Sequence, residues 1–166
     1  MDGFSIFPDL DLRTLMLHLS QVLFAYLLAV PVGWNRERSE RSAGLRTFPL
    51  VAMGACAFIL VGKSVIENPD ANARMIQGLI GGLGFLGGGA ILKHDSAVIG
   101  TATAASIWNT GALGMAVAYQ RYELAIVLSL VNFLTLSLVP GIKSALKPER
   151  DSEPGQSRGR RGLAVA

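Results

Sequence analysis

Charged side chains gather in one short segment, Trp34 to Arg46, which lies between two apolar stretches. It holds four arginines and two glutamates: Arg36, Glu37, Arg38, Glu40, Arg41 and Arg46. Guanidinium groups contact anionic lipid headgroups, so one interpretation is an anchor that fixes membrane orientation. Because glutamates add nothing to anchoring, a second interpretation stays open. In it, Arg46 and Glu37 pair with polar groups farther along the chain, near His94, Asp95, Thr101 and Thr103.

A second segment, Gly78 to Ala90, holds seven glycines and no charge. The Gly-xxx-Gly pairs 78/82 and 84/88 allow helices to approach closely in a bilayer, so we predict a packed central membrane helix that includes Phe85 and Leu86. The run Gly87-Gly88-Gly89 could break it locally. Gly82, Gly84 and Gly87 also match G-x-G-x-x-G, but no strand precedes them and no acidic residue follows at about 20 positions, so nucleotide binding is rejected.

Few other residues could carry chemistry. Asp70 and Arg74 are four apart at the start of the glycine-rich helix, where they could form an ion pair or an outward-facing cation or proton sensor. Magnesium prefers carboxylate oxygens and water, yet the carboxylates near the apolar segments are divided between the two membrane sides, so no metal site is expected. The single Cys56 cannot form an internal disulfide. We therefore expect no cofactor and no enzymatic activity.

The elements that must position these residues are membrane-length helices. The chain is 51% hydrophobic and only 16% charged, and its uncharged stretches of about 16 to 25 residues can cross a bilayer. We predict an all-α, polytopic transmembrane helix bundle over residues 1–142, followed by a polar, largely disordered cytoplasmic tail, 143–166. The five predicted spans cover about residues 14–33, 47–66, 75–92, 98–120 and 124–139.

Polar residues inside these spans should face other helices. Asn109 shares a face with small residues of the fourth span, and Ser129 and Asn132 could form interhelical hydrogen bonds from the fifth. Pro140 and Gly141 are expected to end the fifth helix. The third and fourth helices should form the packed centre.

The basic residues predict the orientation. On one side the loops and the tail hold eleven of them: Arg36, Arg38, Arg41, Arg46, Lys93, Lys143, Lys147, Arg150, Arg158, Arg160 and Arg161. The other side holds four: Arg13, Lys63, Arg74 and Arg121. Basic loops stay cytoplasmic, so the N-terminus should be outside and the C-terminus inside. Without a basic face interleaved with aromatic residues, the pI of 9.4 does not indicate nucleic-acid binding.

Three sequence blocks stand out in order along the chain: Gly33 to Arg38 with Ala43-Gly44-Leu45-Arg46-Thr47, Arg74 with Gly82 to Ile91, and Gly100 to Trp108. Together they resemble the MgtC/SapB family of bacterial inner-membrane proteins over about residues 31–139. The chain departs from the family pattern at Asn35, where an acidic residue is usual, and at Ala102, which replaces one of two threonines. Asp70 also stands four residues before Arg74 where three is common.

The resemblance implies a small multi-pass protein linked to magnesium limitation, acid stress and growth inside host cells. For the best-known relatives it also implies binding to the proton-translocating ATP synthase. We therefore expect a non-enzymatic regulator that contacts lipid, other membrane proteins and a second copy of itself. The alternatives are a small ion transporter or channel built on a glycine-broken third helix, and a lipid-binding scaffold.

Overall fold

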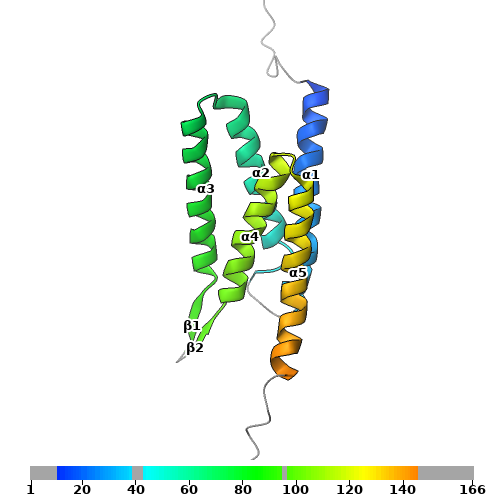
Figure 1. Cartoon of the computed structure of the whole chain (residues 1–166), viewed down its shortest axis with the longest axis vertical. Coiled ribbons are helices and arrows are strands. Elements are labelled where there is room, and N and C mark those ends of the chain that lie inside the picture. The colour runs from blue at the N-terminus through cyan, green and yellow to red at the C-terminus, as the bar shows by residue number, and fades with distance from the viewer. Residues whose placement is uncertain (1–10, 39–42, 95–96, 146–166) are drawn as a thin grey trace, which may run out of the picture.

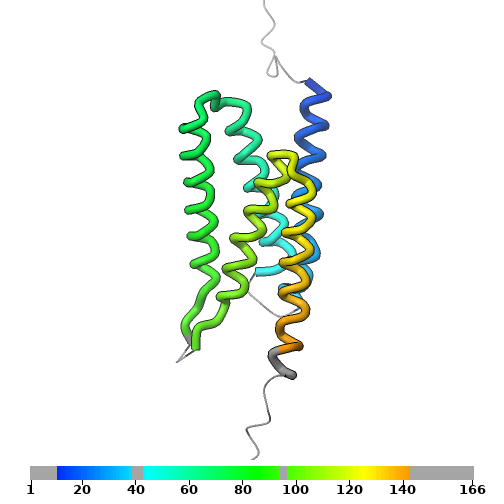
Figure 2. The backbone as a smooth tube through the Cα atoms, in the orientation of Figure 1, coloured from blue at the N-terminus to red at the C-terminus, as the bar shows by residue number. Residues whose placement is uncertain are grey.

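The structure is a computed structural model that describes residues 11–38, 43–94 and 97–145. Within these residues the chain is a helical bundle, as predicted, and it also contains one small β-hairpin that was not predicted. The elements are α1 (Leu12–Arg38), α2 (Thr47–Val65), α3 (Pro69–Gly89), β1 (Leu92–His94), β2 (Ala97–Ile99), α4 (Thr101–Ala118) and α5 (Tyr122–Ala145). The helices run alternately up and down, so α1 begins and α5 ends at opposite ends of the bundle (Figures 1 and 2).

Local sequence signals explain where two helices begin. The Asp11 carboxylate accepts hydrogen bonds from the backbone N–H groups of Arg13 and Thr14, at 3.1 and 3.2 Å, and so caps the first turn of α1. The Asn68 side chain does the same for α3, accepting from the Asp70 N–H at 2.8 Å. The next residue after Asn68 is proline, which suits the first helical position because its missing N–H would be unpaired there.

The turn from α4 to α5 is held by hydrogen bonds to the last carbonyls of α4. Gln120 adopts a left-handed conformation with φ of 60°, and the Arg121 N–H donates to the Ala116 carbonyl at 2.9 Å, which is the Schellman pattern. From α2, the Lys63 ammonium donates to the Ala118 carbonyl at 3.2 Å. A cation at a helix C-terminus is stabilised by the helix dipole, so this contact ties α2 to the end of α4.

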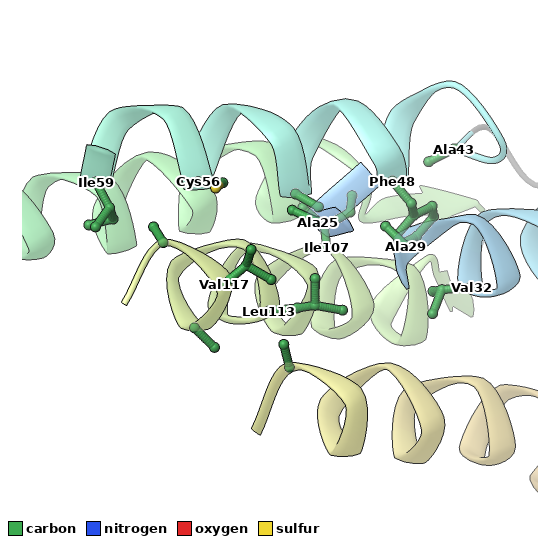
Figure 3. Close-up of a cluster of buried hydrophobic side chains, with 14 of the residues drawn as sticks. Ala25, Ala29, Val32, Ala43, Phe48, Cys56, Ile59, Ile107, Leu113 and Val117 are labelled. Atoms are coloured by element: carbon green, nitrogen blue, oxygen red, sulfur yellow. The ribbon is translucent and has the colours of Figure 1, made fainter. Parts of the chain in front are cut away.

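The centre of the bundle is α4, which packs against each of the other four helices. Apolar side chains from α1, α2 and α4 meet in one cluster, with Val32, Phe48, Cys56, Leu113 and Val117 fully or almost fully buried (Figure 3). Gly114 allows the close approach of α2, because a Cβ there would overlap the Ala52 carbonyl oxygen.

The prediction that α3 also belongs to the packed centre is wrong. This helix lies at the edge of the bundle (Figure 1), and Phe85 on it is 83% exposed. Only Leu83 and Gly87 of α3 are buried. The physical reason is that glycine supplies no side chain to bury, so the glycine-rich helix adds little apolar burial to the centre of the bundle.

Three other boundaries differ from expectation. Helix α5 continues through Pro140 to Ala145, because a proline removes one backbone hydrogen bond without preventing the next turn. A hairpin, with Leu92 opposite Ile99, replaces the short polar connection expected between α3 and α4. Helix α1 extends to Arg38, into the segment predicted as a loop. The predicted disordered tail lies, from residue 146 onward, outside the described residues.

Within the described ranges 11–38, 43–94 and 97–145, three helices are long and apolar enough to cross a membrane by length and composition: α1, α2 and residues Tyr122–Ile142 of α5. Their outward side chains support this assignment, since Leu23 and Leu27 on α1 and Leu130 on α5 are each more than half exposed. A row of exposed leucines is unfavourable in water and favourable against lipid. Five crossings and the orientation stay predictions.

Candidate functional site

All three sequence blocks reach the same end of the bundle. Helix α1 ends there, α2 begins there, α3 ends there and α4 begins there, next to the hairpin (Figure 1). The fold therefore brings the charged segment, the end of the glycine-rich helix and the start of α4 to one place. We refer to it as the hairpin end.

The turn that precedes α2 is docked on the last turns of α1. The Glu37 carboxylate accepts a hydrogen bond from the Leu45 N–H at 3.0 Å. A Cβ at Gly44 would lie 3.2 Å from the Glu37 Cα, and a Cβ at Gly33 would lie 3.1 Å from the Leu45 Cα. Because Gly33 and Gly44 carry no side chains, the backbone of α1 and the backbone of the turn are in close contact here. The Gly44 carbonyl accepts a hydrogen bond from the Thr47 N–H at 3.0 Å, at the first residue of α2.

This geometry changes the role expected for Glu37. The second interpretation paired Glu37 with the far ends of α3 and α4, whereas the structure pairs its carboxylate with its own connecting turn. Arg46 is exposed and lines a groove between α2 and α3. Its expected partner Asp95 lies outside the described residues, as do Glu40 and Arg41, and of His94 only the backbone in β1 is described. A contact of Arg46 with Asp95 stays a prediction.

The last turn of α1 holds two further basic residues of the charged segment, Arg36 and Arg38. Arg36 is only 7% exposed. The Arg38 guanidinium lies over the Trp34 ring, 5.7 Å from its centroid, which is a cation–π distance. At position 35, where the resemblance described above implies an acidic residue, the Asn35 amide donates to the Ser137 hydroxyl on α5 at 2.9 Å. This end of α1 is thus tied to α5 by a hydrogen bond that an amide can donate and a carboxylate cannot.

The second and third blocks contact each other where α3 passes into α4. A Cβ at Gly87 would lie 3.2 Å from the Ala104 carbonyl oxygen, so the two helices are in backbone contact. Gly100 has a φ of 90° and lies directly against the Ala90 carbonyl, so only glycine fits there. One turn into α4, Thr103 is buried with 3% exposure.

The other polar residues singled out in the sequence lie at separate places on α3 and α4. Asp70 and Arg74 lie at the opposite end of α3 from the hairpin; both are exposed, and the described part of the chain shows no ion pair between them. Thr101 is at the start of α4 and is exposed. Farther along α4, Trp108 is 52% exposed, and the Asn109 amide donates to the Leu128 carbonyl of α5 at 3.5 Å.

The interhelical hydrogen bond expected from Ser129 is present. Its hydroxyl donates to the Leu28 carbonyl on α1 at 2.6 Å, and the nearby Asn132 is buried. Across residues 11–38, 43–94 and 97–145, no group of three or more His, Cys, Asp or Glu side chains could hold a metal ion.

A groove of about 730 Å³ between α2 and α3 was not apparent from the sequence. Thirteen of the described residues line it: Arg46, Thr47, Leu50, Val51, Gly54, Ala55, Phe58, Met75, Gly78, Leu79, Gly82, Leu83 and Leu86. The two Gly-xxx-Gly pairs face different directions, because Gly78 and Gly82 line this groove whereas Gly84 and Gly88 do not. A Cβ on any of these four glycines would meet nothing within 4 Å. The feature of the sequence that could have indicated this groove is the set of glycines at positions 54, 78 and 82, which leave space between α2 and α3.

Comparisons with known proteins agree on one family. The MgtC family model matches residues 22–145. Protein SrpB of Synechococcus elongatus is 38% identical over 130 residues, which cover 70% of this chain and 71% of SrpB. Protein MgtC of Salmonella typhimurium is 34% identical over 114 residues, and the protein named "Putative magnesium transporter YhiD" of Escherichia coli (strain K12) is 32% identical over 125 residues. The chain covers 48% of that MgtC and 58% of YhiD. No solved structure matches.

Proposed function

The chain belongs to the MgtC family, and from that premise we propose that it is a non-enzymatic, multi-pass protein of the bacterial inner membrane that regulates other membrane proteins during magnesium limitation or acid stress. One observation carries the proposal. A face of α3, formed by Gly81, Gly84, Phe85 and Gly88, is covered by no other part of the described chain. We call it the outer face of α3.

The outer face of α3 suits contact with a helix of another protein. Gly81, Gly84 and Gly88 allow a second backbone to come close, which favours van der Waals packing between helices in lipid. Phe85, at 83% exposure, offers a large side chain for the partner to surround. The proton-translocating ATP synthase is the partner that the family resemblance suggests, and a second copy of the chain is the other candidate.

Site-specific photocrosslinking in native membranes tests this proposal. A photoreactive residue at Phe85 should give adducts with an identifiable membrane protein, more strongly when magnesium is limiting. The matched control is the same residue at Leu130, an exposed apolar position on α5. Gly84→Leu should abolish the Phe85 adducts by filling the outer face. Identical adducts from both positions would remove the support for a regulatory surface.

We also propose that all five helices cross the bilayer, with the hairpin end in the cytoplasm. Helix α3 has 21 residues and α4 has 18, which at 1.5 Å per residue gives about 32 and 27 Å, close to the hydrocarbon thickness. In a Cys56→Ala background, a cysteine at Ser64 should react with an impermeant maleimide from outside the cell. A cysteine at Lys93 should react only after the membrane is opened, and the reverse pattern would overturn the orientation.

The rival function is ion transport, which the name of the relative YhiD favours. That alternative relied on a break inside the third helix, but α3 runs unbroken from Pro69 to Gly89 and ends at the three glycines. Purified protein in liposomes should therefore show no magnesium or proton flux above empty vesicles. A robust flux that Arg46→Gln abolishes would replace the regulatory proposal with a transport function.

A further inference from the structure

The groove between α2 and α3 is apolar except at one end. Leucine, valine, alanine, phenylalanine and glycine form most of its walls, and among the residues that the structure describes Arg46 is the only charged one that lines it. Arg46 is at the hairpin end, immediately before α2, where the guanidinium is exposed. A ligand for this groove therefore needs a long apolar part and an anionic group at one end.

The length of the groove corresponds to one leaflet of a bilayer. Its walls extend from Thr47 to Phe58 on α2 and from Met75 to Leu86 on α3. Eleven helical steps of 1.5 Å give about 17 Å, and half of a hydrocarbon core is about 15 Å. The volume, about 730 Å³, is in the range of small-molecule sites.

We propose that this groove binds one anionic phospholipid, with an acyl chain along Gly54, Gly78 and Gly82 and the phosphate on the Arg46 guanidinium. The inference rests on the proposed membrane insertion and adds a ligand to it. Guanidinium groups bind phosphate oxygens through paired hydrogen bonds. The end that carries Arg46 is also the end assigned to the cytoplasm, where anionic lipids concentrate.

A helix from a second copy fits this groove less well. A membrane-crossing helix needs about 20 residues, or about 30 Å, and the groove covers about half of that. The apolar part of α3 has no charged residue from Met75 to Leu92, so the α3 of a second copy offers no anion to Arg46. A lipid phosphate supplies that charge, and the outer face of α3 stays free for a protein partner.

Quenching by brominated lipids tests the proposal on the full chain in vesicles. Phe58→Trp, in a Trp34→Phe, Trp108→Phe background, places the only tryptophan in the groove, and we call this variant the groove reporter. We expect brominated phosphatidylglycerol to bind next to the introduced indole roughly fivefold more tightly than brominated phosphatidylcholine, the ratio that one basic residue near an anionic lipid supplies. Arg46→Gln should remove this preference, whereas Lys93→Gln, a cation at the same end outside the groove, should leave it unchanged.

A pair of glycine substitutions tests the position of the acyl chain. Gly82→Leu fills the groove and should reduce quenching of the groove reporter by both lipids, whereas Gly84→Leu, on the outer face of α3, should not. Equal quenching by the two lipids with Arg46 intact would overturn the proposal. Two further outcomes would overturn the proposal, because each would indicate that protein and not lipid fills the groove. One is a groove reporter that neither lipid quenches, and the other is a disulfide between two copies of the chain that carry Gly82→Cys. A variant that keeps Trp108 as its only tryptophan separates the proposed lipid site from the proposed membrane insertion. An unquenched Trp108 would contradict membrane insertion itself, whatever the groove binds.

Discussion

Gly44 lies so close to Glu37 that a Cβ on the glycine would overlap the Glu37 carboxylate. The same carboxylate accepts the hydrogen bond from the Leu45 N–H. One glutamate on α1 and one glycine in the turn before α2 therefore dock the start of α2 against the end of α1. Because Arg46 follows directly, this docking also positions the cation of the proposed lipid site.

Gly44→Ala should destabilise the protein by about 1–3 kcal/mol, since the added methyl group must displace the Glu37 carboxylate or the last turn of α1. Gly54→Ala is the matched control because a Cβ there meets nothing within 4 Å, and alanine should stabilise α2 by about 0.5–1 kcal/mol. Unfolding in detergent, followed by circular dichroism, measures both. Equal stability of the two variants would mean that the turn moves away from α1 without penalty.

Glu37→Ala should expose the Leu45 amide to solvent while the rest of the bundle stays folded. The lost hydrogen bond, between an exposed carboxylate and a backbone N–H, contributes about 0.5–1.5 kcal/mol. Hydrogen exchange should therefore be faster at Leu45 and at the first amides of α2 than in the unmodified protein. Glu123→Ala, an exposed glutamate in the first turn of α5, should leave exchange at Leu45 unchanged.

Gly114→Ala tests the position of the core. A Cβ at Gly114 would overlap the Ala52 carbonyl and lie 3.1 Å from the Ala55 Cβ, so α2 and α4 must separate, with a loss of about 1–3 kcal/mol. Gly88→Ala on α3 should be neutral or slightly stabilising, because nothing lies within 4 Å of its Cβ position. If Gly88→Ala lost more stability than Gly114→Ala, the packed centre would lie at α3 and not at α4.

Asp11 should show a pKa below its ordinary value of 3.8, first because the Thr14 hydroxyl donates to its carboxylate and then because the N–H groups of Arg13 and Thr14 do. Between the folded and unfolded pKa values the unfolded chain binds more protons, so this stabilisation of α1 is present above about pH 4 and is lost as the pH falls through the folded pKa. Thr14→Val should raise the pKa of Asp11 toward 3.8 in a carbon-13 NMR titration. An unchanged pKa would show that the hydroxyl has no effect.

Much of the helical content could be read from the sequence because it depends on local chemistry. Membrane-length apolar stretches predict helices, and Asp70 and Arg74 were expected at the start of the third helix, where α3 places them. Ser129 was expected to bond another helix and does so, with the Leu28 carbonyl. The hairpin was missed because Leu92 and Val98 read equally well as ends of apolar helices.

The sequence by itself determined that the chain forms apolar helices with a charged segment between the first two, since length, hydropathy and capping residues act within a few turns. Only the tertiary structure decided that α4 and not α3 lies at the centre, and that Gly78 and Gly82 face a groove that Arg46 also lines. Glycine spacing shows that two helix backbones can approach closely, but it does not show which helix packs against the glycines. The physical reason is that a missing side chain permits contact without specifying a partner, so the packing of all five helices together determines which glycines are covered.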